Sequence, residues 1–328
     1  KNPVAYDGFE PSGQVHIAQG ILRAINVNKM TKAGIKFVML AADWHGWANN
    51  KLGGNLENIQ AAGDYLIEVW KACGMDLKNV KFIRSSDLMK KETYWKTVMQ
   101  IARNSTVKRI LRCSQIMGRK ENEALQASQI FYPCMQAADL FEIGADISQL
   151  GLDQRRVYML AREIGPKLGF YKPVVVSHHM LMGLEKPVSQ EKDAVERAID
   201  LKMSKSKPDS AIFMTDTEED IKRKINKAYC PEKTVEENPV LEYCKHIIFE
   251  KFKNIEIKRP EKFGGNLNIV SFENLKEIYR EGKLHPMDLK QAASFYLNKL
   301  IEPVRNHFEK DTKAKKLLQK ISKFEVTR

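Results

Sequence analysis

Short strand-like runs that alternate with helical patterns occupy the first two thirds of this chain, and this alternation restricts its fold more than any other feature. The runs expected to form strands lie at 3–6, 36–43, 80–85, 146–150 and 173–177. Helical periodicity separates them at 16–33, 55–74, 91–144 and 153–165. Strands separated by helices require right-handed crossovers and form a parallel sheet with helices on both faces. The pattern therefore predicts a doubly wound α/β domain.

The pattern becomes mainly helical from about residue 216. Its periodic segments, separated by glycine and proline, are 217–229, 238–253, 272–281 and 287–307. We therefore predict two domains, an α/β domain over 1–215 with a helical insertion at about 90–130, and an α-helical domain over 216–328. The charged run at 189–200 is interpreted as a surface insertion.

The chain is basic, with 54 Lys and Arg residues against 41 Asp and Glu residues and a formal net charge of +13. This excess favours an acidic partner such as nucleic acid or a nucleotide, although a solvated lysine-rich surface explains the charge equally well. No apolar run is long enough to span a membrane, and no secretion signal is visible. The five cysteines are scattered without metal-ligand spacing, so we expect a soluble, cytoplasmic protein with no structural metal.

The segment Gly8–Gly20, GFEPSGQVHIAQG, follows the first predicted strand directly. Ligands of doubly wound sheets bind where strands end and helices begin. Glycines let a backbone approach a phosphate closely, and a helix that starts near His16 would offer N–H groups to an anion. The spacing matches neither common nucleotide fingerprint. Alone, His16 is explained equally well as a helix cap.

A second signal lies far downstream in DLKMSKSKPDS, a polar run that carries Lys202 and Lys205. Together with the His16 turn, it resembles the class I aminoacyl-tRNA synthetases, with HIAQ in place of HIGH and KMSKS unaltered. The resemblance implies ATP with Mg²⁺ as a substrate and assigns His16, Gln19, Lys202 and Lys205 to stabilising charge on the phosphates, with Ser204 beside them. Ala18 and Gln19 depart from the usual motif.

A third signal is the segment YPCMQAAD, which places Tyr132, Gln136 and Asp139 on one helix face at i, i+4 and i+7. Buried polar groups need partners, so this face suits a polar ligand, although a solvated stripe on an amphipathic helix is the alternative. With Gln154 beyond the next strand, the spacing resembles the tyrosyl-tRNA synthetases of the archaeal and eukaryotic-cytosolic type.

This second resemblance implies roles for individual residues. Tyr132, Gln136 and Gln154 would bind the ammonium group of tyrosine, Tyr6 and Asp139 would bind its phenol, and His45 would line the pocket. The ATP site would include Gly8, Gly151, Asp153, Met180 and Leu181. Arg112 and Arg155 would receive the acceptor end of tRNA, while Phe263 and Asp288 would read the anticodon.

The resemblance spans nearly the whole chain and implies a Rossmann-like, HUP-type catalytic domain followed by a helical anticodon-binding domain. It further implies a homodimeric enzyme that activates L-tyrosine with ATP and charges tRNA(Tyr). Two alternatives stay open at this point. One is a tryptophanyl-tRNA synthetase of the same fold, and the other is a non-catalytic RNA-binding paralogue.

Overall fold

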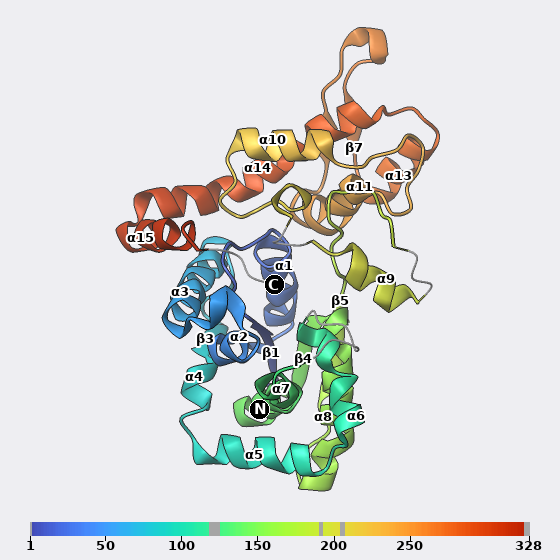
Figure 1. Cartoon of the computed structure of the whole chain (residues 1–328). Helices are drawn as coiled ribbons and strands as arrows, with labels where there is room; N and C mark the ends of the chain where they lie inside the picture. The colour runs from blue at the N-terminus through green and yellow to red at the C-terminus, as the bar shows by residue number, and fades with distance from the viewer. Residues whose placement is uncertain (1, 118–124, 190–192, 204–206, 325–328) are drawn as a thin grey trace.

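A five-stranded parallel sheet forms the centre of the amino-terminal half in the computed structural model, which describes residues 2–117, 125–189, 193–203 and 207–324 (Figure 1). Its order is β3-β2-β1-β4-β5, and all neighbouring strands run parallel. The strands are β1 (Val4–Phe9), β2 (Lys36–Ala41), β3 (Val80–Arg84), β4 (Ile147–Gly151) and β5 (Val174–His178). The prediction of a doubly wound α/β fold is confirmed, because every strand lies within two or three residues of its expected position.

Helices cover both faces of the sheet, because alternate strand residues point to opposite sides. Ala5 and Met39 pack with α1 (Ile21–Lys32) and α3 (Leu56–Ala72), whereas Tyr6 packs on the other face. That face carries α5 (Glu92–Arg103), α7 (Ala127–Ile143) and α8 (Arg155–Ile164). Shorter helical turns join these elements: α2 (Asp43–Ala48), η1 (Lys51–Gly54), α4 (Ser85–Leu88), α6 (Val107–Leu111), η2 (Ser114–Met117), η3 (Leu152–Gln154) and η4 (Gly165–Leu168).

The first helix begins later than predicted, at Ile21 rather than near His16. The amide of Ile17 donates to the carbonyl of Ile212 at 2.8 Å, and the amide of Met214 donates to the carbonyl of Val15 at 2.8 Å. This pairing with a distant segment holds the backbone around His16 in a bridge, which a helix would break. The expectation that His16 stands at a helix amino terminus is therefore wrong.

The carboxy-terminal half is mainly helical, and its predicted helices are present with changed boundaries. Its elements are α9 (Ala194–Leu201), η5 (Pro208–Ser210), α10 (Glu218–Lys227), α11 (Pro239–Tyr243), the π-helix η6 (Cys244–Ile248), α12 (Phe249–Lys251), α13 (Phe272–Arg280), α14 (Pro286–Lys310) and α15 (Thr312–Ile321). The charged run at 189–200 includes most of α9. The sequence analysis missed α15 and the antiparallel pair of β6 (Ile255–Ile257) and β7 (Leu267–Ile269), whose three-residue strands give almost no periodic signal.

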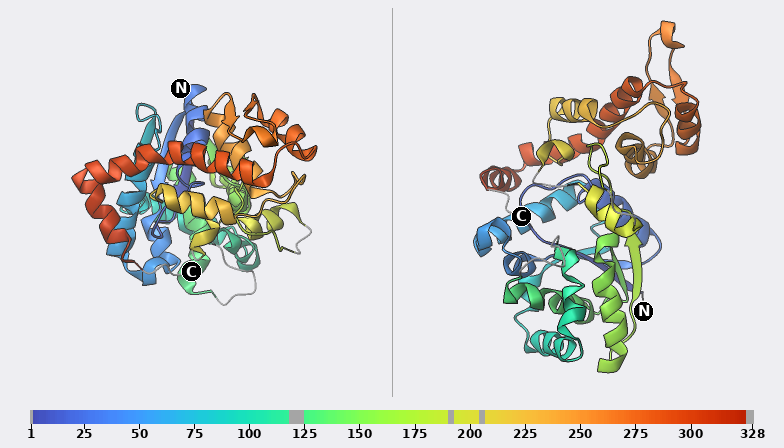
Figure 2. Two further views of the ribbon diagram at one scale, coloured as in Figure 1. Left: turned by 90° about the horizontal axis from the view of Figure 1, so that it is seen from above. Right: turned by 45° about the vertical axis from the view of Figure 1, so that its right-hand side comes forward.

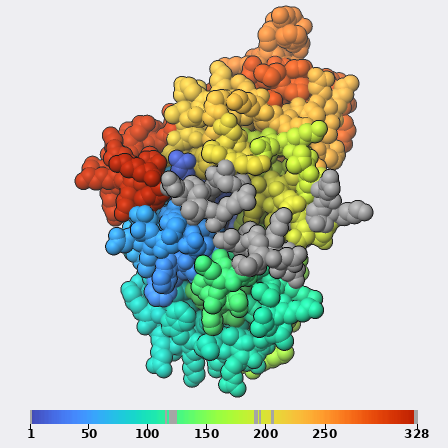
Figure 3. All heavy atoms as spheres, viewed as in Figure 1, coloured from blue at the N-terminus to red at the C-terminus, as the bar shows by residue number. Residues whose placement is uncertain are grey.

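The loop between β6 and β7, which contains η7 (Glu261–Phe263), projects from the end of the helical half farthest from the sheet (Figure 1). The long helix α14 crosses above the sheet when the molecule is seen from above (Figure 2). In the space-filling view the helical half lies above the α/β half, with α15 at one side (Figure 3).

One hydrophobic cluster runs through both halves of the chain. It includes Ala5 and Met39 of the sheet together with Leu297, Phe308 and Ile321 of the last two helices. Within the described ranges, no helix is both long and apolar enough to cross a membrane.

Candidate active site

Side chains predicted to bind tyrosine form a hydrogen-bonded cluster on one face of the sheet, and we call their surroundings the candidate pocket. The Tyr6 hydroxyl lies against the Tyr158 hydroxyl, and the Gln136 amide donates to Tyr158 Oη at 3.0 Å. The same Gln136 nitrogen donates to Gln154 Oε1 at 3.0 Å. Burial, followed by the nearby Tyr158 and Asp139, raises the pKa of Tyr6 well above its ordinary value, so the phenol stays neutral. The structure thus brings together Tyr6, Gln136 and Gln154 as predicted.

Asp139 lies at the buried end of this pocket, on α7. Its Oδ1 accepts a hydrogen bond from the Tyr94 hydroxyl at 2.9 Å, and its Oδ2 lies 3.0 Å from His45 Nε2. Burial opposes the charged form of His45, but the Asp139 carboxylate outweighs burial, and the pKa of His45 is raised. Asp139 is therefore a buried acceptor held in place from two sides. Tyr94 extends this part of the site beyond the predicted residues.

Tyr132 and Glu10 mark the other side of the pocket. The Tyr132 ring stands edge-on to His45, with ring centroids 5.0 Å apart. Burial, then the charge of Glu10 and a hydrogen bond to it, raises the pKa of Tyr132. Glu10 also accepts from Asn49 Nδ2 at 3.1 Å and lies 3.6 Å from Lys51 Nζ. A carboxylate beside Tyr132 suits the ammonium group of an amino acid.

The predicted ATP residues gather at the carboxyl ends of β1, β4 and β5. A Cβ atom on Gly151 would lie 2.6 Å from Asp153 Oδ1 and 2.8 Å from Met180 Sδ, so a larger residue would force these two side chains to shift. Lys202 Nζ forms an ion pair with Asp153 Oδ2 at 3.0 Å. Leu181 packs into the hydrophobic core. Ser204 and Lys205 lie outside the described residues.

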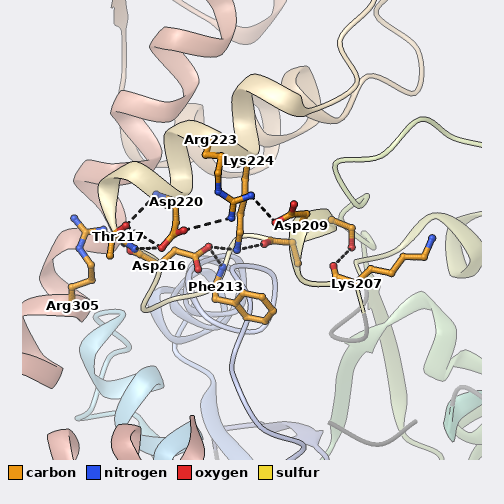
Figure 4. Close-up of polar contacts among 11 residues, drawn as sticks. Lys207, Asp209, Phe213, Asp216, Thr217, Asp220, Arg223, Lys224 and Arg305 are labelled. Carbon is orange, nitrogen blue, oxygen red and sulfur yellow. Dashed lines mark hydrogen bonds and ion pairs between the residues drawn. The ribbon is translucent and has the colours of Figure 1, made fainter. Parts of the chain in front are cut away.

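The turn that carries His16 and Gln19 rests on the segment that follows the KMSKS motif. Its bridge partner Phe213 donates its backbone amide to Asp216 Oδ2 at 2.9 Å. In Figure 4, Lys224 of α10 points toward both residues; its ammonium lies 2.6 Å from Asp216 Oδ2 and 4.7 Å from the Phe213 ring centroid. A buried lysine of the helical half thus supports the backbone opposite His16.

A second buried ion pair lies beneath the glycine turn, on the opposite face of β1 from Tyr6. Arg23 of α1 is fully buried, and its Nη1 lies 3.0 Å from Asp7 Oδ2. Asp7 Oδ1 accepts the amide of Gly8 at 2.8 Å, and Arg23 Nη2 donates to Gln149. Burial raises the pKa of Asp7, and Arg23 partly offsets that shift. Burial and then Arg23 lower the pKa of the neighbouring His178 to about 4, which keeps its imidazole neutral.

The predicted tRNA contacts are spread over three parts of the surface. Arg112 follows α6 and Arg155 begins α8, and both are exposed. Phe263 ends η7 with 59% of its surface exposed, and Lys262 Nζ lies 5.0 Å from its ring centroid. Asp288 is half-buried in the first turn of α14. Arg112 and Arg155 lie near each other in the α/β half, where Arg156 donates to the Arg112 carbonyl at 3.3 Å, whereas Phe263 and Asp288 belong to the helical half.

The sequence analysis missed three residues of the pocket, namely Glu10, Tyr94 and Tyr158. Tyr158 follows Gln154 by four residues, so helical spacing from a predicted site residue was an available signal. Tyr94 and Glu10 gave no such signal, because their positions depend on how α5 and the first turn pack. No three His, Cys, Asp or Glu side chains lie close enough to hold a metal ion in the part of the chain that the structure describes.

Comparison with known proteins identifies the family. A family model described as tRNA synthetases class I (W and Y) matches residues 1–302. The chain is 50% identical over 329 aligned residues to "Tyrosine--tRNA ligase 1, cytoplasmic" of Arabidopsis thaliana, which covers 99% of this chain and 82% of the relative. The tyrosyl-tRNA synthetase of Pyrococcus horikoshii, solved with L-tyrosine, superposes with a TM-score of 0.90 at 40% identity, covering 97% of this chain and 91% of that one.

The tryptophanyl alternative is not supported. The match to the tryptophanyl-tRNA synthetase of Aeropyrum pernix covers all of this chain and 82% of that enzyme's chain. Its identity is 19% and its TM-score is 0.69, so the match shows a shared fold alone. The non-catalytic alternative is not supported either, because the named relatives at 40–50% identity are ligases. The chain therefore belongs to the class I tRNA synthetases and, within them, to the tyrosine–tRNA ligases of the archaeal and eukaryotic-cytoplasmic type.

Proposed function

We propose that this chain joins L-tyrosine to Mg²⁺-bound ATP, forming tyrosyl-adenylate and pyrophosphate, and then transfers the tyrosyl group to tRNA(Tyr). The observation that carries the assignment is the buried polar cluster of Tyr6, Gln136 and Asp139, which connects through Gln154 to the η3 turn, where Asp153 pairs with the KMSKS lysine Lys202. An amino-acid pocket next to a phosphate-binding edge suits adenylate formation.

The reaction needs positioning and positive charge more than a covalent group. The tyrosine carboxylate attacks the α-phosphorus, and negative charge develops on the phosphate oxygens and on the departing pyrophosphate. In this proposal, His16, Gln19, Lys202 and Lys205 supply hydrogen-bond donors to those oxygens. Asp153, together with Gly151 and Met180, holds the ribose and base. Magnesium arrives with ATP as part of the substrate.

Recognition of tyrosine divides between the two ends of the pocket. Tyr132, Gln136 and Gln154 bind the ammonium group, and the Glu10 carboxylate beside Tyr132 supplies the opposite charge. Asp139, fixed by His45 and Tyr94, accepts the hydrogen bond of the substrate phenol. Tyr6, on β1, is the second proposed partner of the substrate phenol.

We further propose that Arg112 and Arg155 contact the acceptor end of tRNA, and that Phe263 and Asp288 read the anticodon. An exposed aromatic ring with a lysine beside it suits base stacking, and a carboxylate suits the donor groups of a base edge. The loop that carries Phe263 projects from the end of the helical half farthest from the sheet (Figure 1), which suits contact with a part of the tRNA distant from its acceptor end.

The proposed assembly is a cytoplasmic homodimer through the catalytic half. In support, Trp44 contacts both Trp47 and Trp95, and Met99 follows one turn after Trp95 on α5. Trp47, Trp95 and Met99 are all exposed, which favours a partner surface. Met99→Glu should give monomers in sedimentation, whereas Leu77→Glu, at an exposed leucine elsewhere, should not. A dimer that survives Met99→Glu places the interface on another surface.

The deciding experiment is ATP–pyrophosphate exchange by the purified protein without tRNA, with tyrosine, phenylalanine, tryptophan or no amino acid. We expect exchange with tyrosine alone. Lys202→Ala should reduce it strongly, and Lys227→Ala, at an exposed lysine of α10, should leave it unchanged. Exchange with tryptophan would overturn the pocket assignment, and no exchange with any amino acid would overturn the proposed reaction.

A further inference from the structure

The segment between β5 and α9 connects the ATP site to both halves of the molecule. It carries Met180, which lies against Gly151, and then Met182, which forms an antiparallel bridge with Lys202. The amide of Gly183 continues this pairing by donating to the carbonyl of Leu201 at 2.8 Å. The backbone of this segment therefore fixes the position of Lys202 relative to Met180 and Gly151.

A glutamate from the helical half holds this segment from the other side. Glu242 lies in α11, and its Oε1 accepts the backbone amide of Met182 at 2.7 Å. The same oxygen lies 2.8 Å from His179 Nε2. The hydroxyl of the adjacent Tyr243 donates to the carbonyl of Met182 at 3.4 Å. Both backbone polar groups of Met182 are thus bound by consecutive residues of one helix.

The helix that follows Glu242 departs from regular geometry at this contact. Residues Cys244–Ile248 form a π-helix, an element that is rare and often occurs at functional sites. His246 within it stacks on His179, with ring centroids 4.3 Å apart and planes at 15°. Glu242 and His246 together hold His179, the residue directly after the end of β5.

We propose that Glu242 is a positioning residue for ATP, through which the helical half sets the place of Met180 and Lys202. This inference rests on the proposed function, since it takes the site around Gly151 and Lys202 to be the ATP site. Glu242 touches no reacting atom in this account. Its carboxylate acts through the Met182 backbone, and the tyrosine pocket on the other face of the sheet does not depend on it.

The test compares Glu242→Ala and Glu242→Gln with wild-type protein in tyrosine-dependent ATP–pyrophosphate exchange. Losing a hydrogen bond to a charged acceptor predicts that kcat/KM for ATP falls about 10- to 100-fold in Glu242→Ala. The loss should appear mainly in KM for ATP, while KM for tyrosine stays within about twofold. Glu242→Gln keeps an acceptor for the Met182 amide and should recover most of the activity.

One further measurement and one control variant separate positioning from general damage. Hydrogen–deuterium exchange should speed up in the peptide that contains Met182 in Glu242→Ala, because that amide loses its acceptor. Glu236→Ala serves as the matched control, since this exposed glutamate of the same half forms an ion pair with Arg280 at the surface. It should change neither measurement.

The outcomes are decisive in each case. Faster hydrogen–deuterium exchange at Met182 in Glu242→Ala, with an unchanged KM for ATP, would overturn the proposal. The contact would then exist without affecting the binding of ATP. Equal losses for ATP and tyrosine, with a lowered melting temperature, would also overturn it in favour of a purely structural role. If the wild-type protein shows no tyrosine-dependent ATP–pyrophosphate exchange, the proposed function fails instead.

Discussion

The buried pair of Arg23 and Asp7 permits a sharp test of the structure. Arg23→Met replaces the guanidinium with an apolar chain of similar length and leaves the Asp7 carboxylate without its counter-charge in a site closed to solvent. Removing one member of a buried ion pair costs about 3–5 kcal/mol. For a chain of 328 residues, a loss of about 4 kcal/mol lowers the melting temperature by roughly 6 °C.

The pH dependence of this loss has a definite sign. Burial raises the pKa of Asp7 and Arg23 partly offsets that rise, so Arg23→Met should raise the pKa further. An acid whose pKa is raised on folding destabilises the fold most at high pH. The deficit of the variant should therefore shrink as the pH falls from 8 toward 5, as the variant takes up its proton.

A second substitution separates the effect of the Asp7 charge from that of its hydrogen bond. Asn at position 7 keeps an oxygen for the Gly8 amide but carries no charge, so Asp7→Asn added to Arg23→Met should restore several kcal/mol relative to Arg23→Met alone. Urea denaturation followed by tryptophan fluorescence measures the stability of the wild type, Arg23→Met, Asp7→Asn and the double variant. Additive losses in the double variant, or an Arg23→Met loss below about 1 kcal/mol, would refute the reasoning.

Three other predictions follow from the site and the fold. Asp139→Asn should lower the preference for tyrosine over phenylalanine about 10- to 100-fold in pyrophosphate exchange, since the phenol loses a charged acceptor; tyrosyl enzymes are the established example of such selectivity, and an unchanged ratio would remove Asp139 from that role. Burial raises the pKa of Asp43, but hydrogen bonds, led by the one from Ser85 at 2.7 Å, outweigh burial and lower that pKa. Ser85→Ala should therefore reduce the free energy of unfolding by about 1.5–3 kcal/mol at pH 7. That cost should disappear as the pH falls through the folded pKa of Asp43, and urea denaturation at several pH values will show a pH-independent cost if the reasoning fails. Asp288→Ala should raise KM for tRNA in aminoacylation without changing exchange, and equal losses in both reactions would contradict the anticodon assignment.

The sequence predicted the sheet well because each strand is a buried run between glycine, proline or polar punctuation. It predicted the start of α1 poorly, since the backbone around His16 pairs with residues about 200 positions away. No local pattern contains that information. The short strands β6 and β7 were missed for a related reason, because three residues are too few for a period to be visible.

The residues of the candidate site divide in the same way, into those that a local pattern predicts and those whose position depends on long-range packing. Tyr132, Gln136 and Asp139 share a helix face that spacing alone reveals, and family resemblance supplied Tyr6 and Gln154. Tyr94 reaches Asp139 only because α5 packs across α7, and Glu10 meets Tyr132 only because the first turn folds over the pocket. Such partners depend on packing between elements, which one sequence does not encode in any readable period.

The hydrophobic cluster shared by both halves has a consequence for how the molecule melts. Tyr65 of α3 and Phe308 of α14 lie with ring centroids 5.1 Å apart, and Ala314 and Ile321 of α15 are buried in the same cluster. Cutting the chain at residue 216 would therefore remove apolar cover from the parallel sheet and leave both fragments prone to aggregate. The helical half and the α/β half should unfold in one cooperative transition, so a destabilising change in α15 should also destabilise the sheet.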